Sequence, residues 1–145
     1  GDIAATIMVG VTDPGIVELV ETTRQALEAG IAAVAPGRRL SDISHAVEQR
    51  ALAGRCGVVR DFVGHGIGRE LHEEPQVPNY GRPGRGPVLQ PGMVFCIEPM
   101  LSRGAPEVRV LPDRWTVVTR DGRPAAHCEH MVAVAPDGVE VLTRA

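Results

Sequence analysis

Apolar residues recur at helical spacing in the first third of the chain and predict two amphipathic helices. Asp13 and Pro14 are typical of the cap and the first position of a helix over about residues 14–35. Ser41 is expected to cap a second helix, which ends at Gly54. Both helices should pack on a sheet through their apolar faces. The positions that indicate the first face are Ile16, Val20, Leu27, Ile31 and Val34.

The pattern then changes to short apolar runs between glycine and proline turns, which predicts strands. Residues 3–9, before the helices, also form an apolar run that suits a buried strand. The strongest strand prediction covers residues 93–100, where Val94, Cys96 and Glu98 share one face. Helices first and strands later predict an α+β fold with helices on one side of an antiparallel sheet. Further strands are expected at 107–111, 115–119, 129–135 and 139–143.

Composition narrows the class of protein. The 145 residues are enough for one domain with a sizeable core. A formal net charge of −3 with scattered basic residues favours neither nucleic acid nor a membrane surface as a partner, and no apolar run approaches the length of a membrane span. Cys56, Cys96 and Cys128 lack the paired spacing of a zinc site. They predict reduced thiols in a cytoplasmic protein.

Residues 61–80 hold the most distinctive chemistry of the chain. His65 lies between Gly64 and Gly66, so the backbone there should be free to adopt shapes that a side chain would forbid. His72 follows seven residues later and opens the run His-Glu-Glu-Pro. Two histidines in this setting indicate a functional site better than either does alone.

Asp2, His65, Glu98 and Glu129 are the candidate ligands of that site, with His72 nearby. Carboxylate oxygens and one imidazole suit a divalent metal such as Mn, Fe or Co better than a thiolate zinc site. Carboxylates on neighbouring strands repel one another unless cations lie between them, so a pair of metals would explain why strands carry them inward. Such a pair can activate water and polarise a carbonyl, which hydrolysis of an amide requires.

Each candidate also has a structural interpretation, which the sequence leaves open. His65 could be a hydrogen-bonded core histidine, and Glu98 or Glu129 could be a charge at a strand end or edge. Asp2 stands at the first peptide, where disorder is the default. His130 follows Glu129 directly in an expected strand, so it should point to the opposite face and have a structural role.

Five segments, taken in order, resemble the type I methionine aminopeptidases, which have the creatinase or pita-bread fold. The runs His-Glu-Glu-Pro-Gln-Val and Ile-Glu-Pro-Met favour this family over prolidases and Xaa-Pro aminopeptidases, which share the fold. The similarity spans essentially the whole chain. The segments are 1–2 leading to 9–10, 64–69 running into 72–77, 91–93 with 97–100, 115–117, and 129–130.

The resemblance implies a role for each matching residue. His65, Glu98 and Glu129 match metal ligands, and Asp2 and Glu129 match carboxylates that bridge two divalent ions, which could be Co, Mn, Fe or Zn. His72 matches a histidine that contacts substrate and supports the developing tetrahedral centre. Glu98 is also placed to relay a proton.

Trp115 matches an aromatic residue at the rim of the methionine pocket. The implied reaction removes N-terminal methionine from nascent polypeptides whose second residue is small, since an apolar pocket would select the unbranched thioether. The implied protein is a cytoplasmic monomer, and contact with the ribosome stays open.

The departures from the family pattern matter as well. The family's first metal-binding aspartate would lie before Gly1. Val63 stands where cysteine is frequent. Leu71 and Cys128 stand where aromatic residues are usual, so we expect these two to leave less side-chain volume near the site. We therefore expect residues 1–145 to form a single, incomplete aminopeptidase catalytic domain, a fragment with impaired activity. The alternative is a non-catalytic remnant or binding module of the same fold.

Overall fold

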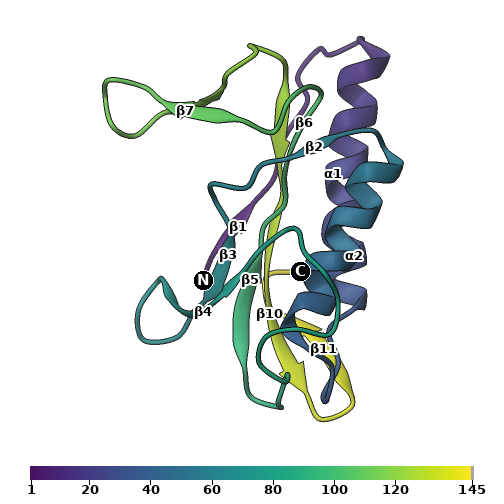
Figure 1. The fold of residues 1–145 in the computed structure, drawn as a ribbon, viewed down its shortest axis with the longest axis vertical. Coiled ribbons are helices and arrows are strands. Elements are labelled where there is room, and N and C mark those ends of the chain that lie inside the picture. The colour runs from purple at the N-terminus through teal and green to yellow at the C-terminus, as the bar shows by residue number, and fades with distance from the viewer. Residues whose placement is uncertain (145) are drawn as a thin grey trace.

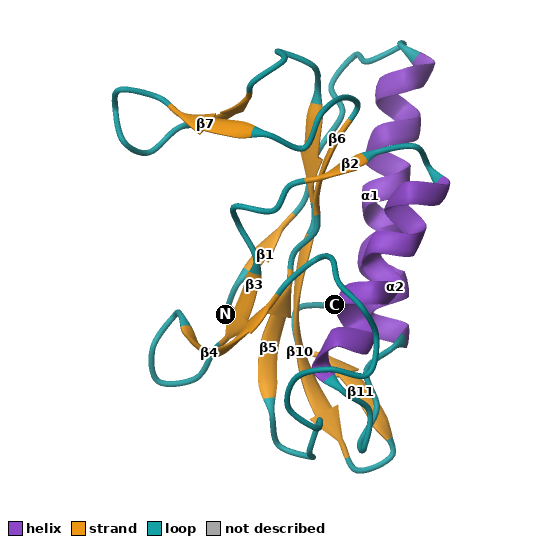
Figure 2. Cartoon of the chain, in the orientation of Figure 1, coloured by secondary structure: helices purple, strands orange, loops and turns teal. Residues whose placement is uncertain are grey.

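A computed structural model, which describes residues 1–144, places two helices side by side against one side of a set of antiparallel strands (Figures 1 and 2). The helices are α1 (Pro14–Ala32) and α2 (Leu40–Ala53). Neither is both long and apolar enough to span a membrane. The strands are β1 (Ile3–Ala4), β2 (Gly57–Val58), β3 (Gly64–Gly66), β4 (Glu73–Val77), β5 (Val94–Ile97), β6 (Met100–Ser102), β7 (Val108–Val110), β8 (Val117–Thr119), β9 (Ala125–His127), β10 (Glu129–Ala135) and β11 (Gly138–Val141).

The main sheet has the strand order β1-β10-β5-β3-β4, and β11 pairs with β10 as well. All its pairs are antiparallel. Strands β2, β6 and β9 form a smaller sheet, and β7 and β8 form a hairpin that stands away from the rest of the molecule (Figure 1). The α+β class, with both helices on one face of an antiparallel sheet, is confirmed.

The two helices begin differently from one another. Asp13 caps α1 as predicted, because its side chain accepts a hydrogen bond of 2.7 Å from the Gly15 amide. The prediction that Ser41 caps α2 is wrong. The cap position is Arg39, whose amide donates to the Asp42 carboxylate at 2.9 Å. Ser41 lies inside the helix, and its hydroxyl accepts from the Arg85 amide instead.

The N-terminal run is the largest error in the predicted strands. Only Ile3–Ala4 of the predicted strand 3–9 pairs with the sheet, and it does so through β10. Ile7 and Val9 are 76% and 86% exposed, so this run is not buried. Apolar composition favours a strand, but a strand also needs a partner for its backbone. Beyond Ala4 this segment has none among residues 1–144.

The core lies between the helices and the main sheet. Phe95, Ile97 and Val132 point from β5 and β10 toward the helices and are almost completely buried. The two helices approach closely at Gly30 of α1, where an added Cβ would lie 2.7 Å from a methyl group of Val47 in α2. The alternation predicted for residues 93–100 therefore holds, although β5 itself is shorter.

The later strands match their predictions closely. The segments predicted at 107–111, 115–119 and 129–135 contain β7, β8 and β10, and the one at 139–143 overlaps β11, which begins one residue earlier. β10 is the longest strand and pairs with β1, β5 and β11. It therefore connects the N-terminal segment to the centre of the sheet.

Candidate metal centre

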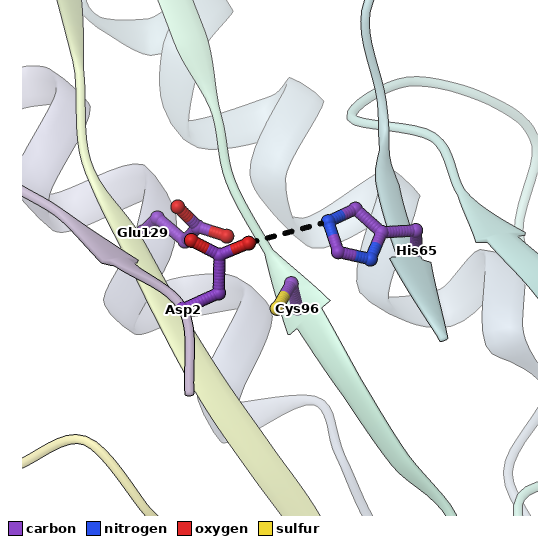
Figure 3. A group of neighbouring side chains, drawn as sticks. All are labelled: Asp2, His65, Cys96 and Glu129. Atoms are coloured by element: carbon purple, nitrogen blue, oxygen red, sulfur yellow. Dashed lines mark ion pairs between the residues drawn. The ribbon is translucent and has the colours of Figure 1, made fainter. Parts of the chain in front are cut away.

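Neighbouring strands of the main sheet bring the predicted site residues together, although they lie far apart in the sequence. Asp2 directly precedes β1, Glu129 is the first residue of β10, and His65 is the central residue of β3. Glu98 directly follows β5. Since β1, β10, β5 and β3 are adjacent in that order, one ligand arrives from each strand. Figure 3 shows the side chains of Asp2, His65 and Glu129 converging on one point, together with Cys96.

The distances are those of a compact cluster. Asp2, His65, Cys96 and Glu129 each offer a ligand atom, and these atoms all lie within 4.8 Å of one another. His65 Nε2 lies 3.8 Å from Asp2 Oδ2. Glu98 Oε1 lies 3.5 Å from the same nitrogen. Three of the four predicted metal ligands therefore lie around one point, and the fourth, Glu98, lies next to His65.

Glu129 is the most constrained acid of the cluster. It is only 5% exposed, and its Oε1 is buried with no hydrogen-bond partner among residues 1–144. Burial raises the pKa of this carboxyl, and the negative charges of Glu98 and Asp2 raise it further. A buried carboxylate without a partner is costly, so the cluster is favourable for a cation.

His65 is held in place by close contact between strands. An added Cβ at Gly64 would lie 2.2 Å from the Cys96 carbonyl oxygen, and one at Gly66 would lie 2.2 Å from the Glu74 carbonyl oxygen. Neither glycine adopts a positive φ. A side chain is therefore excluded at both glycines, as predicted, but by the close approach of neighbouring strands and not by a left-handed backbone.

His72 lies against His65, with 4.2 Å between the ring centroids. It precedes β4 and is exposed to solvent. Both histidines line an open hollow of about 510 Å³, together with Phe62, Glu74 and Glu98. The second histidine of the 61–80 segment thus lies where a molecule entering the hollow would meet it.

Two residues of this region were missed by the sequence analysis. Cys96 was assigned to no site, yet its sulfur lies among the candidate ligands. His127 Nε2 is buried 3.6 Å from Glu98 Oε2, and Thr6 holds its backbone through hydrogen bonds of 2.9 Å and 2.8 Å. The alternation of side chains between the two faces of a strand could have identified both residues. It places Cys96 on the face of Glu98, and His127 on the face of Glu129.

Three other predictions concern positions near the site. Cys128 faces away from the cluster and lines a hollow beside α1, so the expectation that this small residue leaves less side-chain volume near the site is wrong. His130 also lines that hollow, with Nδ1 2.8 Å from Thr143 Oγ1, which agrees with its predicted orientation. Leu71 is 53% exposed and borders a different shallow hollow, next to Gly1.

Trp115 lies in the β7–β8 hairpin and is 87% exposed. It does not line the hollow at His65. The base of the hairpin borders a neighbouring apolar hollow of about 380 Å³, which shares Phe62 with the first. His127 lines this second hollow as well. The two hollows therefore meet around Phe62.

The residues present fit a divalent cation. Two carboxylates and an imidazole converge, a third carboxylate lies 3.5 Å from that imidazole, and one buried carboxylate oxygen lacks a partner among residues 1–144. Ligand bonds to such ions are about 2.0–2.3 Å long, so two ligand atoms on one ion lie at most about 4.5 Å apart. The observed separations come close to that limit without any movement of the backbone.

Comparisons of sequence and of structure with known proteins agree on one family of enzymes. The model of metallopeptidase family M24 matches residues 1–136. The chain is 47% identical to methionine aminopeptidase 1 of Bacillus subtilis over 99% of its own length and 58% of the relative's. It is 50% identical to methionine aminopeptidase 1 of Mycobacterium tuberculosis, over 99% and 56%. The crystal structure of a methionine aminopeptidase from Thermotoga maritima superposes with a TM-score of 0.98 at 50% identity, over all of this chain and 58% of that one. The chain thus spans somewhat more than half the length of the relatives that it matches.

Proposed function

The chain belongs to metallopeptidase family M24, and from this membership we propose that the protein is a metal-dependent aminopeptidase that removes N-terminal methionine from polypeptides. The pita-bread fold implied by the resemblance is confirmed. The relatives named above are methionine aminopeptidases, which supports the same activity here. The observation that carries the proposal is the convergence of Asp2, His65 and Glu129 on one point beside Glu98.

We propose that Asp2, His65, Glu98 and Glu129 hold divalent metal, as one part of a site for two ions. Co, Mn, Fe and Zn are the candidates, since carboxylate and imidazole ligands suit all of them. Bound there, such ions would supply a Lewis acid that activates water and polarises the scissile carbonyl. Glu129, buried with an unpartnered oxygen, would be the ligand that depends most on a bound cation.

The protein's own groups supply proton transfer and substrate positioning in this proposal. Glu98 lies between two imidazoles, His65 at 3.5 Å and His127 at 3.6 Å, and it also faces the open hollow. It can accept a proton from the attacking water and pass it to the leaving amine. His72, packed on His65, would donate a hydrogen bond to the substrate carbonyl as negative charge develops there.

The substrate would enter through the hollow at His65 and His72. Phe62 lies where this hollow meets the apolar one, so it would contact an unbranched apolar side chain. The base of the hairpin that carries Trp115 borders the second hollow, but Trp115 itself lines neither hollow, so its place at the rim rests on the family resemblance alone. The proposed substrates are polypeptides whose methionine precedes a small residue.

Partners and location follow from the same proposal. We expect the protein to act as a cytoplasmic monomer on nascent chains. Contact with the ribosome would bring it to them. The cysteines are free and buried, which is typical of a reducing compartment.

Release of methionine from a Met-Gly-Met-type peptide, measured with added Co²⁺ or Mn²⁺, tests the proposal. Wild-type protein should release methionine in a metal-dependent way, and His65→Ala should reduce the rate at least about 100-fold, the lower range for a catalytic group. His45→Ala is the matched control. It removes a half-buried imidazole from α2, on the other side of the sheet, and should keep most of the activity.

Equal release of methionine by wild type and by His65→Ala would contradict the proposal. Equal loss in both histidine variants, with melting temperatures lowered alike, would trace the activity to folding and not to this site. Metal binding without any release of methionine would favour the non-catalytic alternative.

A further inference from the structure

Cys96 is the one thiol of the chain that lies among acids. It belongs to β5, whose neighbours in the sheet are β10 and β3. Its side chain alternates with those of Phe95 and Ile97, which enter the core, so the sulfur projects from the opposite face. Figure 3 shows it between Asp2 and His65, and its sulfur lies within 4.8 Å of their ligand atoms and that of Glu129.

This position is unusual for a cysteine that serves packing. Cys96 is completely buried, and burial together with the charge of Glu129 raises the pKa of its thiol. Beside it, the buried Oε1 of Glu129 has no hydrogen-bond partner among residues 1–144. Two buried groups that could each bind a cation therefore face one another, and the basic groups near them are the imidazoles of His65 and His127.

We infer that Cys96 is a direct metal ligand, so that this centre binds one of its cations through sulfur as well as through Asp2, His65 and Glu129. The inference rests on the metal centre of the proposed function. It adds a soft ligand that the carboxylates and imidazole do not provide. Cys96 would hold the cation together with the three residues whose ligand atoms lie within 4.8 Å of its sulfur.

Ligand exchange at this sulfur is balanced in atoms and charge. The S–H bond breaks as the sulfur–metal bond forms, and the proton leaves to solvent. No oxidant or reductant takes part. The cation supplies the positive charge that allows a thiolate to lie beside two carboxylates.

A sulfur ligand changes which ions the centre prefers. Thiolate is a soft ligand and favours Zn²⁺ and Co²⁺ over Mn²⁺, whereas carboxylates alone suit Mn²⁺ well. Without the sulfur, the same site should lose discrimination between these ions. Cys96 would therefore control which metal ion the centre prefers, independently of the other ligands.

Cobalt spectroscopy of the metal-free protein tests this directly, because a sulfur–Co²⁺ bond gives a charge-transfer band in the near ultraviolet that oxygen and nitrogen ligands do not. Wild type, Cys96→Ser, Cys96→Ala and Cys128→Ser would each be titrated with Co²⁺, with bound metal measured by elemental analysis. Cys128→Ser is the matched control, since Cys128 is also buried but lines the hollow on the helix side. A competition between Zn²⁺ and Mn²⁺ would follow.

Wild type and Cys128→Ser should show the band. Cys96→Ser and Cys96→Ala should bind Co²⁺ without it and should lose roughly tenfold or more of their preference for Zn²⁺ over Mn²⁺. Bound Co²⁺ without a band in wild type would overturn the inference and leave the proposed function standing. A band that persists in Cys96→Ser would also overturn it. Failure of wild type to bind Co²⁺ at all would overturn both.

Discussion

The two faces of the main sheet are built from the same strands, but their buried side chains lie in opposite environments. On the helix side, Phe95 and Ile97 of β5 are buried against apolar neighbours. On the other side, Cys96 and Glu129 are buried among acids. A shift of one position along a strand moves a side chain from one environment to the other.

The helix-side face contributes to stability, whereas the acidic face carries the candidate metal centre. The helix-side face removes apolar surface from water, which stabilises the fold without any ligand. The acidic face has buried carboxylates that repel one another, and it becomes favourable only with a cation present. Substitutions should therefore have opposite effects on the two faces, and the following predictions test this contrast.

The largest effect is expected on the helix-side face. Phe95→Ala removes an almost fully buried ring and should lower the free energy of unfolding by about 3–5 kcal/mol, measured by chemical denaturation. Val110→Ala, at a side chain that is 53% exposed in the hairpin, is the control and should change it by less than about 0.5 kcal/mol. Similar losses in the two variants would mean that the core is not where stability resides.

Gly64→Ala should act on both faces at once. The added methyl group would lie 2.2 Å from the Cys96 carbonyl oxygen, so β3 and β5 must separate. We expect a loss of about 1–3 kcal/mol in stability together with weaker metal binding, measured by calorimetry.

Gly1→Ala provides the comparison for that variant. Its added methyl group would meet only a methionine carbon at 4.0 Å, next to the site residue Asp2. This variant should bind metal normally. If Gly64→Ala also did so, His65 would not depend on the close approach of these strands.

Glu129→Gln should have opposite effects with and without metal. In the metal-free protein it removes a buried charge that lacks a partner, so the free energy of unfolding should rise by on the order of 1 kcal/mol. Affinity for Co²⁺ should fall, because a neutral amide replaces a carboxylate ligand. Thermal unfolding with and without Co²⁺ checks both signs, and a metal-free variant less stable than wild type would contradict the view that this face is strained.

The smallest effect concerns Asp42, at the start of α2 and away from both faces. Hydrogen bonds from the Arg39 and Gly84 amides lower the pKa of this carboxyl from its ordinary value of 3.8. A lowered pKa in the folded state means that the stabilisation is present above the unfolded pKa and is lost as the pH falls through the folded one.

Asp42→Ala should therefore cost about 0.3–1 kcal/mol at neutral pH, kept small by partial exposure to water, and less at acidic pH as the carboxyl becomes protonated. Denaturation curves at pH 7 and pH 2.5 would show this. A difference between variant and wild type that stays constant with pH would exclude the ionised carboxylate as its source.

Local patterns were sufficient for much of the fold. The α1 cap at Asp13, the end of α2 at Gly54 and the alternation along β5 were predicted because neighbours in sequence decide them. The predicted strand over residues 3–9 was wrong, because strand formation depends on a distant partner. For the same reason, the cap predicted at Ser41 was wrong, since a remote loop binds that hydroxyl.

Residue identity and spacing by themselves determined the fold class, the family resemblance and the set of candidate ligands, because residue type carries the chemistry. Only the tertiary structure decided that β1, β10, β5 and β3 lie next to one another, and hence that Asp2, Glu129 and His65 meet. It also brought Cys96 into that group and turned Cys128 away from it. The physical reason is that sheet pairing joins residues more than 100 positions apart, and no local pattern encodes which strand becomes the neighbour of which.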